Sequence, residues 1–371
     1  MRLSSSVRWA LLIAVGFVLT ACGSGARSLP NSGSSPGSSP ASTQKASLIV
    51  VSDQPAGPDE SSASINLRLV RPDGSQAQQL TVKQGAAVLA ARGDRIFIKE
   101  GSALKALHKD GSVETLGDLG TSNILAFVAS PDGNRWMWGT EESTSQVHIA
   151  GSGMNPRVVA ESNDPRTSVE PFSWTPVAPF VAHATTGLGD RVFTPAAGPV
   201  EKLDPATFTL QPIAHTDQCA FSDMARDGTV ACVRRLTDPN PPPRLMLMSP
   251  DGKTQTIKLN PSNFPEEGDA YFSQDGRLVT IAGSTGYGNH SGPDHNVTDL
   301  VTAKDGSIRR LADGLRPSSD LNWQTWLDDG SLVLWRPDGA AGGPSGIFVV
   351  SPAGSAKQIS KGGFAVGLIT G

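Results

Sequence analysis

The stretch that decides the fold reads Phe127-Val128-Ala129-Ser130-Pro131-Asp132-Gly133-Asn134-Arg135-Trp136. It places a short apolar run before an Asp-Gly pair and resumes strand-like sequence after it. Asp-Gly is a strong signal for a tight β-hairpin, because the turn needs residues that tolerate a positive φ angle. The stretch therefore predicts two antiparallel strands joined at Asp132-Gly133.

Turns of this kind recur in two interleaved series, each turn lying between two strand-like runs. The first series comprises Asp73-Gly74, Asp110-Gly111, Gly151-Ser152-Gly153, Ala197-Gly198, Asp251-Gly252, Asp305-Gly306 and Ala353-Gly354. The second comprises Gly93-Asp94, Asp132-Gly133, Pro176 to Pro179, Asp227-Gly228, Asp275-Gly276 and Asp329-Gly330. Two hairpins in each unit make a four-stranded antiparallel sheet, which is the repeating unit of a β-propeller. The sequence predicts an all-β fold, a seven-bladed β-propeller.

The two ends of the repeat region complement each other. The first unit begins with Ser47 to Val51 and lacks an innermost strand, whereas Phe364 to Ile369 is an unpaired strand-like run after the last unit. We expect this C-terminal strand to close blade one, because a closed ring removes the open sheet edges that invite aggregation.

Three hairpins share an aromatic residue followed by Ser-Pro-Asp-Gly or a close variant: Phe127 to Trp136, Tyr271 to Leu278 and Trp326 to Leu332. This pattern resembles the repeat of TolB-type propellers, and the resemblance covers residues 46–371. Blade four, with Trp174-Thr175-Pro176, and blade two, with Gly93-Asp94, depart from it. The resemblance implies an extracytoplasmic scaffold used for protein contacts, and it specifies architecture better than activity.

The N-terminus has the order of an export signal. The positively charged Arg2 and Arg8 come first, and an apolar run follows from Trp9 to Leu19. The signal ends with Leu19-Thr20-Ala21-Cys22. The run of about 11 residues is too short to span a bilayer as a helix, so residues 1–21 are expected to be a signal peptide. Leu-Thr-Ala-Cys resembles the bacterial lipobox, which implies that Cys22 carries acyl chains such as palmitate and anchors the protein to a bacterial membrane, outside the cytoplasm.

The remaining chain divides by composition. Residues 22–46 hold the lipidated Cys22 and a run of Ser, Gly and Pro, which predicts a flexible tether, and residues 47–371 are left for the propeller.

Lys and Arg number 31 against 35 Asp and Glu, and the net charge is −4. A nucleic-acid partner is therefore not expected, because it would require a clustered basic surface.

Within the predicted propeller, residues 47–371, the familiar hydrolase and metalloprotease motifs are missing, since neither Gly-x-Ser-x-Gly nor His-Glu-x-x-His occurs there. Propeller enzymes of lyase or lactonase type instead place histidines and carboxylates at the mouth of the central channel. Candidates for that position are Glu170, His215, Asp217, Asp269 and Asp320. The carboxylate oxygens of Glu170, Asp217, Asp269 and Asp320 would suit a calcium ion, which stays open as an alternative to a water-filled mouth; no other cofactor or metal is expected.

Long links between the second and third strands mark one face of the predicted ring. They are Ser52 to Ser64, Arg234 to Arg244, Gly283 to Asn296 and Arg336 to Gly346, in four consecutive blades. Long loops on a rigid framework are where binding usually occurs. The expected binding face contains Arg234, Arg235, Arg244, Tyr287, His290, Asp294, His295 and Arg336. For the segment with His290, Asp294 and His295, an exposed loop is favoured over a transition-metal site, because a glycine-rich loop gives metal ligands no rigid template.

These observations favour a lipid-anchored, non-enzymatic scaffold that binds a protein, peptide or envelope component through this face. The alternative is an enzyme of lyase or lactonase type that acts at the channel mouth.

Two cysteines remain after Cys22. If Phe221-Ser222 takes the turn position of Phe272-Ser273, Cys219 lies directly opposite Cys232 in a hairpin, at a Cα separation that a disulfide accepts. A disulfide between Cys219 and Cys232 is therefore expected, with two buried apolar cysteines as the alternative.

Overall fold

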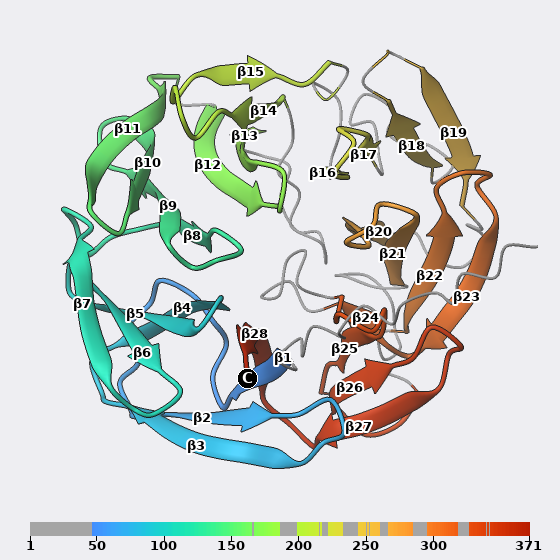
Figure 1. The fold of residues 1–371 in the computed structure, drawn as a ribbon, viewed down its shortest axis with the longest axis horizontal. Helices are drawn as coiled ribbons and strands as arrows, with labels where there is room; N and C mark the ends of the chain where they lie inside the picture. Colours follow the sequence, from blue (N-terminus) through green and yellow to red (C-terminus); the bar gives the residue numbers. More distant parts are fainter. Residues whose placement is uncertain are drawn as a thin grey trace, which may run out of the picture. The chain divides into compact units, whose positions relative to one another are not determined.

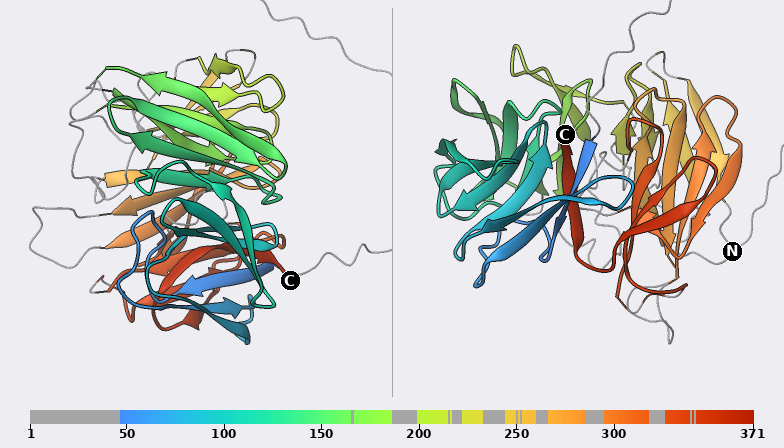
Figure 2. Two further views of the ribbon diagram at one scale, coloured as in Figure 1. Left: turned by 90° about the vertical axis from the view of Figure 1, so that its left-hand side faces the viewer. Right: turned by 60° about the horizontal axis from the view of Figure 1, so that its bottom comes forward.

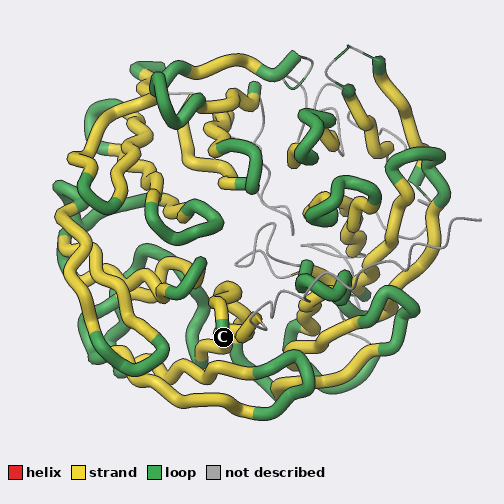
Figure 3. The backbone as a smooth tube through the Cα atoms, viewed as in Figure 1, coloured by secondary structure: helices red, strands yellow, loops and turns green. Residues whose placement is uncertain are grey.

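The computed structural model describes residues 47–371 except for 165–166, 186–198, 215, 217–221, 233–243, 250, 252, 260–265, 285–294, 318–325, 339 and 341. The chain divides into two units, and all described residues belong to the second, Lys45–Gly371. Every regular element among them is a β-strand (Figure 3). The described part of the chain contains no helix that could cross a membrane. The predicted signal peptide, Cys22 and the tether lie outside the described residues.

One sheet has eight strands, in the order β3-β2-β1-β28-β4-β5-β6-β7. Its first half contains β1 (Ser47–Ser52), β2 (Ile65–Val70), β3 (Gln76–Val82) and β28 (Phe364–Thr370). Its second half contains β4 (Ala87–Arg92), β5 (Arg95–Glu100), β6 (Ala103–His108) and β7 (Val113–Asp118).

The other sheets among the described residues have four strands each. The next two along the chain contain β8 (Ala126–Ala129), β9 (Arg135–Glu141), β10 (Ser145–Gly151) and β11 (Met154–Ser162), then β12 (Thr167–Trp174), β13 (Pro179–Thr185), β14 (Val200–Leu203) and β15 (Leu210–Pro212). The last three contain β16 (Ser222–Met224), β17 (Val230–Cys232), β18 (Arg244–Met248) and β19 (Thr254–Lys258); β20 (Glu266–Phe272), β21 (Leu278–Ser284), β22 (Asn296–Thr302) and β23 (Ile308–Asp313); and β24 (Arg316–Pro317), β25 (Leu332–Arg336), β26 (Gly346–Val350) and β27 (Ala356–Ser360).

The sheets surround a common centre, as in a β-propeller (Figure 1). Strands β28, β4, β8, β12, β16, β20 and β24 lie nearest the centre, and the later strands of each sheet lie progressively farther out. The predicted all-β propeller architecture is confirmed.

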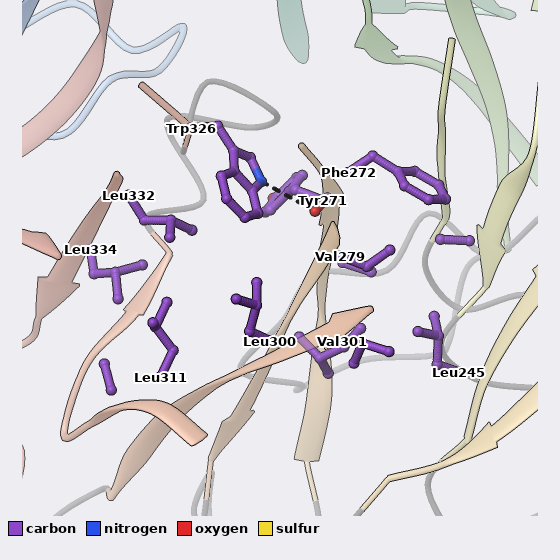
Figure 4. Packing of buried hydrophobic residues seen from close by; sticks show 14 of the residues in the cluster. Leu245, Tyr271, Phe272, Val279, Leu300, Val301, Leu311, Trp326, Leu332 and Leu334 are labelled. Atoms are coloured by element: carbon purple, nitrogen blue, oxygen red, sulfur yellow. Dashed lines mark hydrogen bonds between the residues drawn. The ribbon is translucent and has the colours of Figure 1, made fainter. Parts of the chain in front are cut away.

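Apolar packing between neighbouring sheets holds this arrangement together. Phe97 of β5 is fully buried against Trp136 and Trp138 of β9, in a cluster that joins the second half of the large sheet to the sheet after it. A larger cluster joins the last three sheets and includes Leu245, Phe272, Leu300, Trp326 and Leu334 (Figure 4). Each fully buried side chain of this size contributes about 1.5–3 kcal/mol. Similar clusters lie between the other neighbouring sheets, so each sheet is covered on both faces.

Side-chain hydrogen bonds explain the repeated Ser-x-Asp-Gly turn. Ser130 Oγ donates to Asp132 Oδ1 at 2.5 Å and accepts from the N–H of Arg135 at 2.9 Å. Ser273 makes the same pair of bonds, to Asp275 Oδ1 at 2.7 Å and from the N–H of Leu278 at 3.0 Å. Serine and aspartate thus satisfy the polar groups of a turn whose glycine has a positive φ.

The C-terminal strand joins the two ends of the described chain. β28 pairs antiparallel with β1 from Ser47↔Thr370 to Ser52↔Phe364, and the two strands lie side by side in both views of Figure 2. This confirms the predicted pairing of the C-terminal strand with the first strand. The other edge of β28 meets β4 through one parallel bridge, Gly367↔Ala91, which makes the large sheet continuous.

A buried arginine ties three innermost strands together. Arg92, at the end of β4, is 5% exposed, and its guanidinium donates to the carbonyl oxygens of Ala129 at 3.4 Å and Trp174 at 3.0 Å. These acceptors belong to β8 and β12. Burial lowers the pKa of Arg92.

The register predicted for the cysteine hairpin is wrong. Cys232 lies opposite Ser222, and the turn runs from Ala225 to Thr229, because Ala225 donates its N–H to the carbonyl of Thr229. Cys219 lies outside the described residues, so the disulfide stays a prediction, without the directly opposed geometry on which it was based.

The close approach of β28 to β4 gives a first testable prediction. A Cβ at Gly367 would lie 2.2 Å from the carbonyl oxygen of Ala91, so Gly367→Ala must push the two strands apart. We expect a loss of about 1–3 kcal/mol in the free energy of unfolding, measured by urea denaturation. The control is Gly117→Ala in β7, where a Cβ meets no atom within 4 Å and stability should not fall. Equal urea midpoints for the two variants would contradict a tight contact at this seam.

Candidate functional site

Only one of the five channel-mouth residues has a described side chain. Glu170 lies in the innermost strand β12, where its Oε1 accepts a hydrogen bond from Ser168 Oγ at 3.0 Å. Asp269 is described only as part of the backbone of β20, and His215, Asp217 and Asp320 lie outside the described residues. No group of three or more possible metal ligands is found in the described part of the chain. The acidic ring stays a prediction, and a calcium ion there stays an open alternative to a water-filled mouth.

Most of the expected binding face also lies outside the described residues. This applies to Arg234, Arg235, Tyr287, His290 and Asp294, and Arg244 is described only through the backbone of β18. Of the whole set, His295 and Arg336 have described side chains. His295 directly precedes β22, and its Nε2 lies 2.7 Å from Oδ1 of Asp313, the last residue of β23.

Arg336 corrects the expectation of an exposed binding residue. It is 7% exposed, with Nε donating to the carbonyl of Gly314 at 2.9 Å and Nη1 to that of Pro344 at 3.2 Å. The guanidinium carbon lies 5.0 Å from the centre of the Phe348 ring. Arg336 therefore joins parts of the chain to one another and does not project from a loop.

The long link of blade one is folded onto the neighbouring half of the large sheet. Gly57 and Ser61 donate their N–H groups to the carbonyls of Val88 and Ala86. Glu60 accepts from the buried Lys99 at 3.1 Å and from the N–H of Gly101 at 2.7 Å. These contacts fix the link against the neighbouring half of the sheet, and its place in a binding face stays a prediction. The sequence reading also missed a further long link, between Thr185 and Val200.

The most unusual polar group in the described structure is Asp223, which the sequence reading did not select. It lies in β16 and is only 6% exposed. Its Oδ2 accepts a hydrogen bond from the N–H of Phe272, at the end of β20, at 2.8 Å. The other oxygen, Oδ1, is buried without a hydrogen-bond partner among the described residues. Asp223 thus lies where two innermost strands meet.

This environment changes the acidity of the carboxyl group. Burial raises the pKa of Asp223 to about 7, against the N–H groups of Phe272 and Met224, which lower it. Burial acts in this direction because a low-dielectric surrounding disfavours the charged form. A carboxyl group that titrates near neutral pH can both accept and return a proton under physiological conditions, as general acid-base catalysis requires.

A sequence signal for Asp223 exists, but the wrong hairpin register hid it. With the observed turns aligned, Ala225 takes the place of Ser130 and Ser273, so Asp223 takes the place of Val128 and Tyr271. An acidic residue at a position that is apolar or aromatic in other sheets is a candidate for function.

Comparisons with known proteins identify the fold. No protein-family model matches the chain, and no curated protein sequence matches it. Several solved structures match this chain in fold. The tricorn protease superimposes with a TM-score of 0.54 at 10% identity, over 85% of this chain and 35% of that one, so this chain spans about a third of its length. A putative 6-phosphogluconolactonase from Bacteroides fragilis NCTC 9343 superimposes with a TM-score of 0.51 at 12% identity, over 88% of this chain and 98% of that one. One from Bacteroides uniformis ATCC 8492 gives 0.51 at 10% identity, over 88% and 99%.

These likenesses correct the expectation that the protein is not an enzyme. Identities of 10 to 12% show the fold alone. Yet chains of this fold and of nearly this length are described as lactonases, so the propeller and the missing hydrolase motifs give no ground for excluding catalysis.

Proposed function

We propose that the protein is a hydrolase of lactonase type, with Asp223 as the group that transfers protons. The observation that carries the proposal is the buried carboxyl of Asp223, with one oxygen fixed by Phe272, the other without a described partner, and a pKa raised to about 7. The likeness in fold to chains described as 6-phosphogluconolactonases supports the choice of a sugar lactone as substrate class.

In the proposed mechanism Asp223 performs the proton transfers of lactone hydrolysis. The ionised carboxylate accepts a proton at Oδ1 from a water molecule whose oxygen attacks the lactone carbonyl carbon. The ring C–O bond then breaks, and the same proton passes to the departing ring oxygen, which gives the open hydroxy acid. The N–H of Phe272 holds Oδ2 during both transfers, so the carboxyl group keeps one orientation.

Three finer features belong to the same proposal. The two halves of the eight-stranded sheet, joined by the single bridge at Gly367, would count as two blades, giving seven with the five other sheets. The Ser-x-Asp-Gly turns support a TolB-type repeat. The N-terminal sequence supports an extracytoplasmic protein attached to a bacterial membrane through lipid on Cys22.

The activity test uses glucono-1,5-lactone and the full-length chain. We expect the wild type to hydrolyse the lactone above the spontaneous rate, with kcat/KM rising with pH around a midpoint near 7 as Asp223 ionises. Asp223→Asn keeps the shape of the side chain but cannot accept the proton, and should lower kcat by about 100-fold or more.

Asp305→Asn is the matched control, because it makes the same chemical change in an exposed turn between β22 and β23. It should retain the wild-type rate. A wild-type rate equal to that of Asp223→Asn, or to the spontaneous rate, would reject the proposed function.

Stability gives a second, independent test of Asp223. An unfolded aspartate titrates near 3.9, whereas folded Asp223 titrates at about 7. Below pH 4 the folded and the unfolded protein both hold the proton on Asp223. As the pH rises from about 4 to 7 the unfolded state loses this proton first, so the free energy of unfolding falls. Above about pH 7 both states are ionised and the free energy of unfolding levels off. The difference in pKa corresponds to roughly 4 kcal/mol.

Asp223→Asn should therefore match the wild type near pH 4 and exceed it in stability at pH 8, measured by urea denaturation. Asp305→Asn should show no such gain. If Asp223→Asn were less stable than the wild type at pH 8, the carboxylate would be a structural group and its assignment to catalysis would be wrong.

The anchor is tested by Cys22→Ala, which removes the thiol that would carry the lipid. The variant should leave the membrane fraction and lose the mass of the acyl chains. A variant that still sediments with membranes and still carries acyl groups would refute attachment at Cys22.

A further inference from the structure

A second set of buried polar groups lies between the sheet that contains β20–β23 and the sheet that contains β24–β27. Asn296 and Thr298 of β22 are 1% and 0% exposed, and Arg336 of β25 is 7% exposed. Asn296 and Thr298 are two residues apart in one strand, so their side chains point to the same face of the sheet. This polar set is separate from Asp223, which belongs to β16.

The main chain of Asn296 and the side chain of Arg336 both contact Gly314, which lies between β23 and β24. The N–H of Gly314 donates to the carbonyl of Asn296 at 2.7 Å, and the carbonyl of Gly314 accepts from Arg336 Nε at 2.9 Å. Thr298 Oγ1 donates to the next carbonyl, that of Leu315, at 2.9 Å. The face of β22 that carries Asn296 therefore looks toward the segment that Arg336 contacts.

Two polar groups at this place lack a complementary partner in the described structure. Asn296 Nδ2 is buried and has no hydrogen-bond partner among the described residues. Arg336 contacts the neutral carbonyls of Gly314 and Pro344 and the ring of Phe348, and within the described structure it forms no ion pair with a carboxylate. A buried donor without an acceptor and a buried cation without a counter-charge both cost stability.

Two glycines let the backbone close over the guanidinium. A Cβ on Gly343, whose φ is +130°, would lie 2.8 Å from Arg336 Nη1. A Cβ on Gly342, whose φ is +99°, would lie 3.8 Å from Nη2. At Gly342 and Gly343 the link between β25 and β26 thus approaches the guanidinium with its main chain alone.

We propose that Asn296 and Arg336 form a binding site for a small oxyanion, held between these two sheets. The anion would accept hydrogen bonds from Asn296 Nδ2 and Arg336 Nη2 and would neutralise the guanidinium. Arg336 suits this role because a guanidinium presents several N–H groups in one plane and binds carboxylates and phosphates through two bonds.

The experiment measures the melting temperature of the full-length chain in three separate salt solutions of equal ionic strength: inorganic phosphate, acetate and chloride. Bound phosphate should raise the melting temperature by about 2–5 °C at roughly ten times its Kd. Acetate, tested alone, distinguishes a carboxylate site from a phosphate site, and chloride should have no effect. A rise in melting temperature with phosphate or acetate beyond that with chloride supports the site if it is absent in Arg336→Met, because phosphate also stabilises folded proteins without binding. A rise that persists in Arg336→Met, or equal responses to all three salts, rejects the site.

Asn296→Asp is the decisive variant, because it places a carboxylate where the anion is proposed to bind. If the site exists, the new carboxylate pairs with Arg336, so the variant should melt above the wild type in chloride and lose its response to phosphate. If Asn296 and Arg336 do not share a site, the variant buries an unpaired charge and should melt well below the wild type.

Arg336→Met removes the charge and should abolish the phosphate response. Arg71→Met makes the same change at an exposed arginine in the turn after β2, and should leave the response intact. Loss of the response in Arg71→Met as well would show general screening of charge by salt and would overturn the proposal.

Discussion

Each sheet of this protein is apolar on both faces, and this single constraint requires the ring. A sheet covered on one face only would leave residues such as Phe97 or Leu334 in water, at a cost of about 1.5–3 kcal/mol each. Every sheet therefore needs two neighbours, and a row of sheets can meet that need only by joining its ends. The pairing of β28 with β1 supplies the junction, using strands from opposite ends of the described chain.

The sequence predicted best what local chemistry determines. Ser130-Pro131-Asp132-Gly133 and its relatives specify turns through bonds within a few residues, so the hairpins could be found without any knowledge of the neighbouring sheets. The pairing of the C-terminal strand could also be predicted, because an unpaired strand was left over at one end and missing at the other.

What failed depended on contacts between sheets. In the cysteine hairpin Ala225 occupies the place of the usual serine, so the local signal was lost and the register was placed three residues too early. Arg336 looked exposed because it begins a long link, yet its acceptor is Gly314, which precedes the innermost strand of its sheet and lies 22 residues away. Asp223 could not be recognised before the register was known, and its raised pKa comes from burial between two sheets, which a linear sequence does not show.

The position of β28 in the chain sets the order of events during synthesis. About 310 residues separate Ser52 from Phe364, which at ribosomal speeds of about 5–20 residues per second is roughly 15–60 s of elongation. For that whole interval the inner edge of β1 has no partner strand, although its side chains already drive collapse with β2. An open edge of this kind accepts a matching strand from any source. Two nascent copies held close together can thus exchange their last strands, each β28 completing the other molecule, and such interlocked dimers are the misassembly to which this ring is exposed.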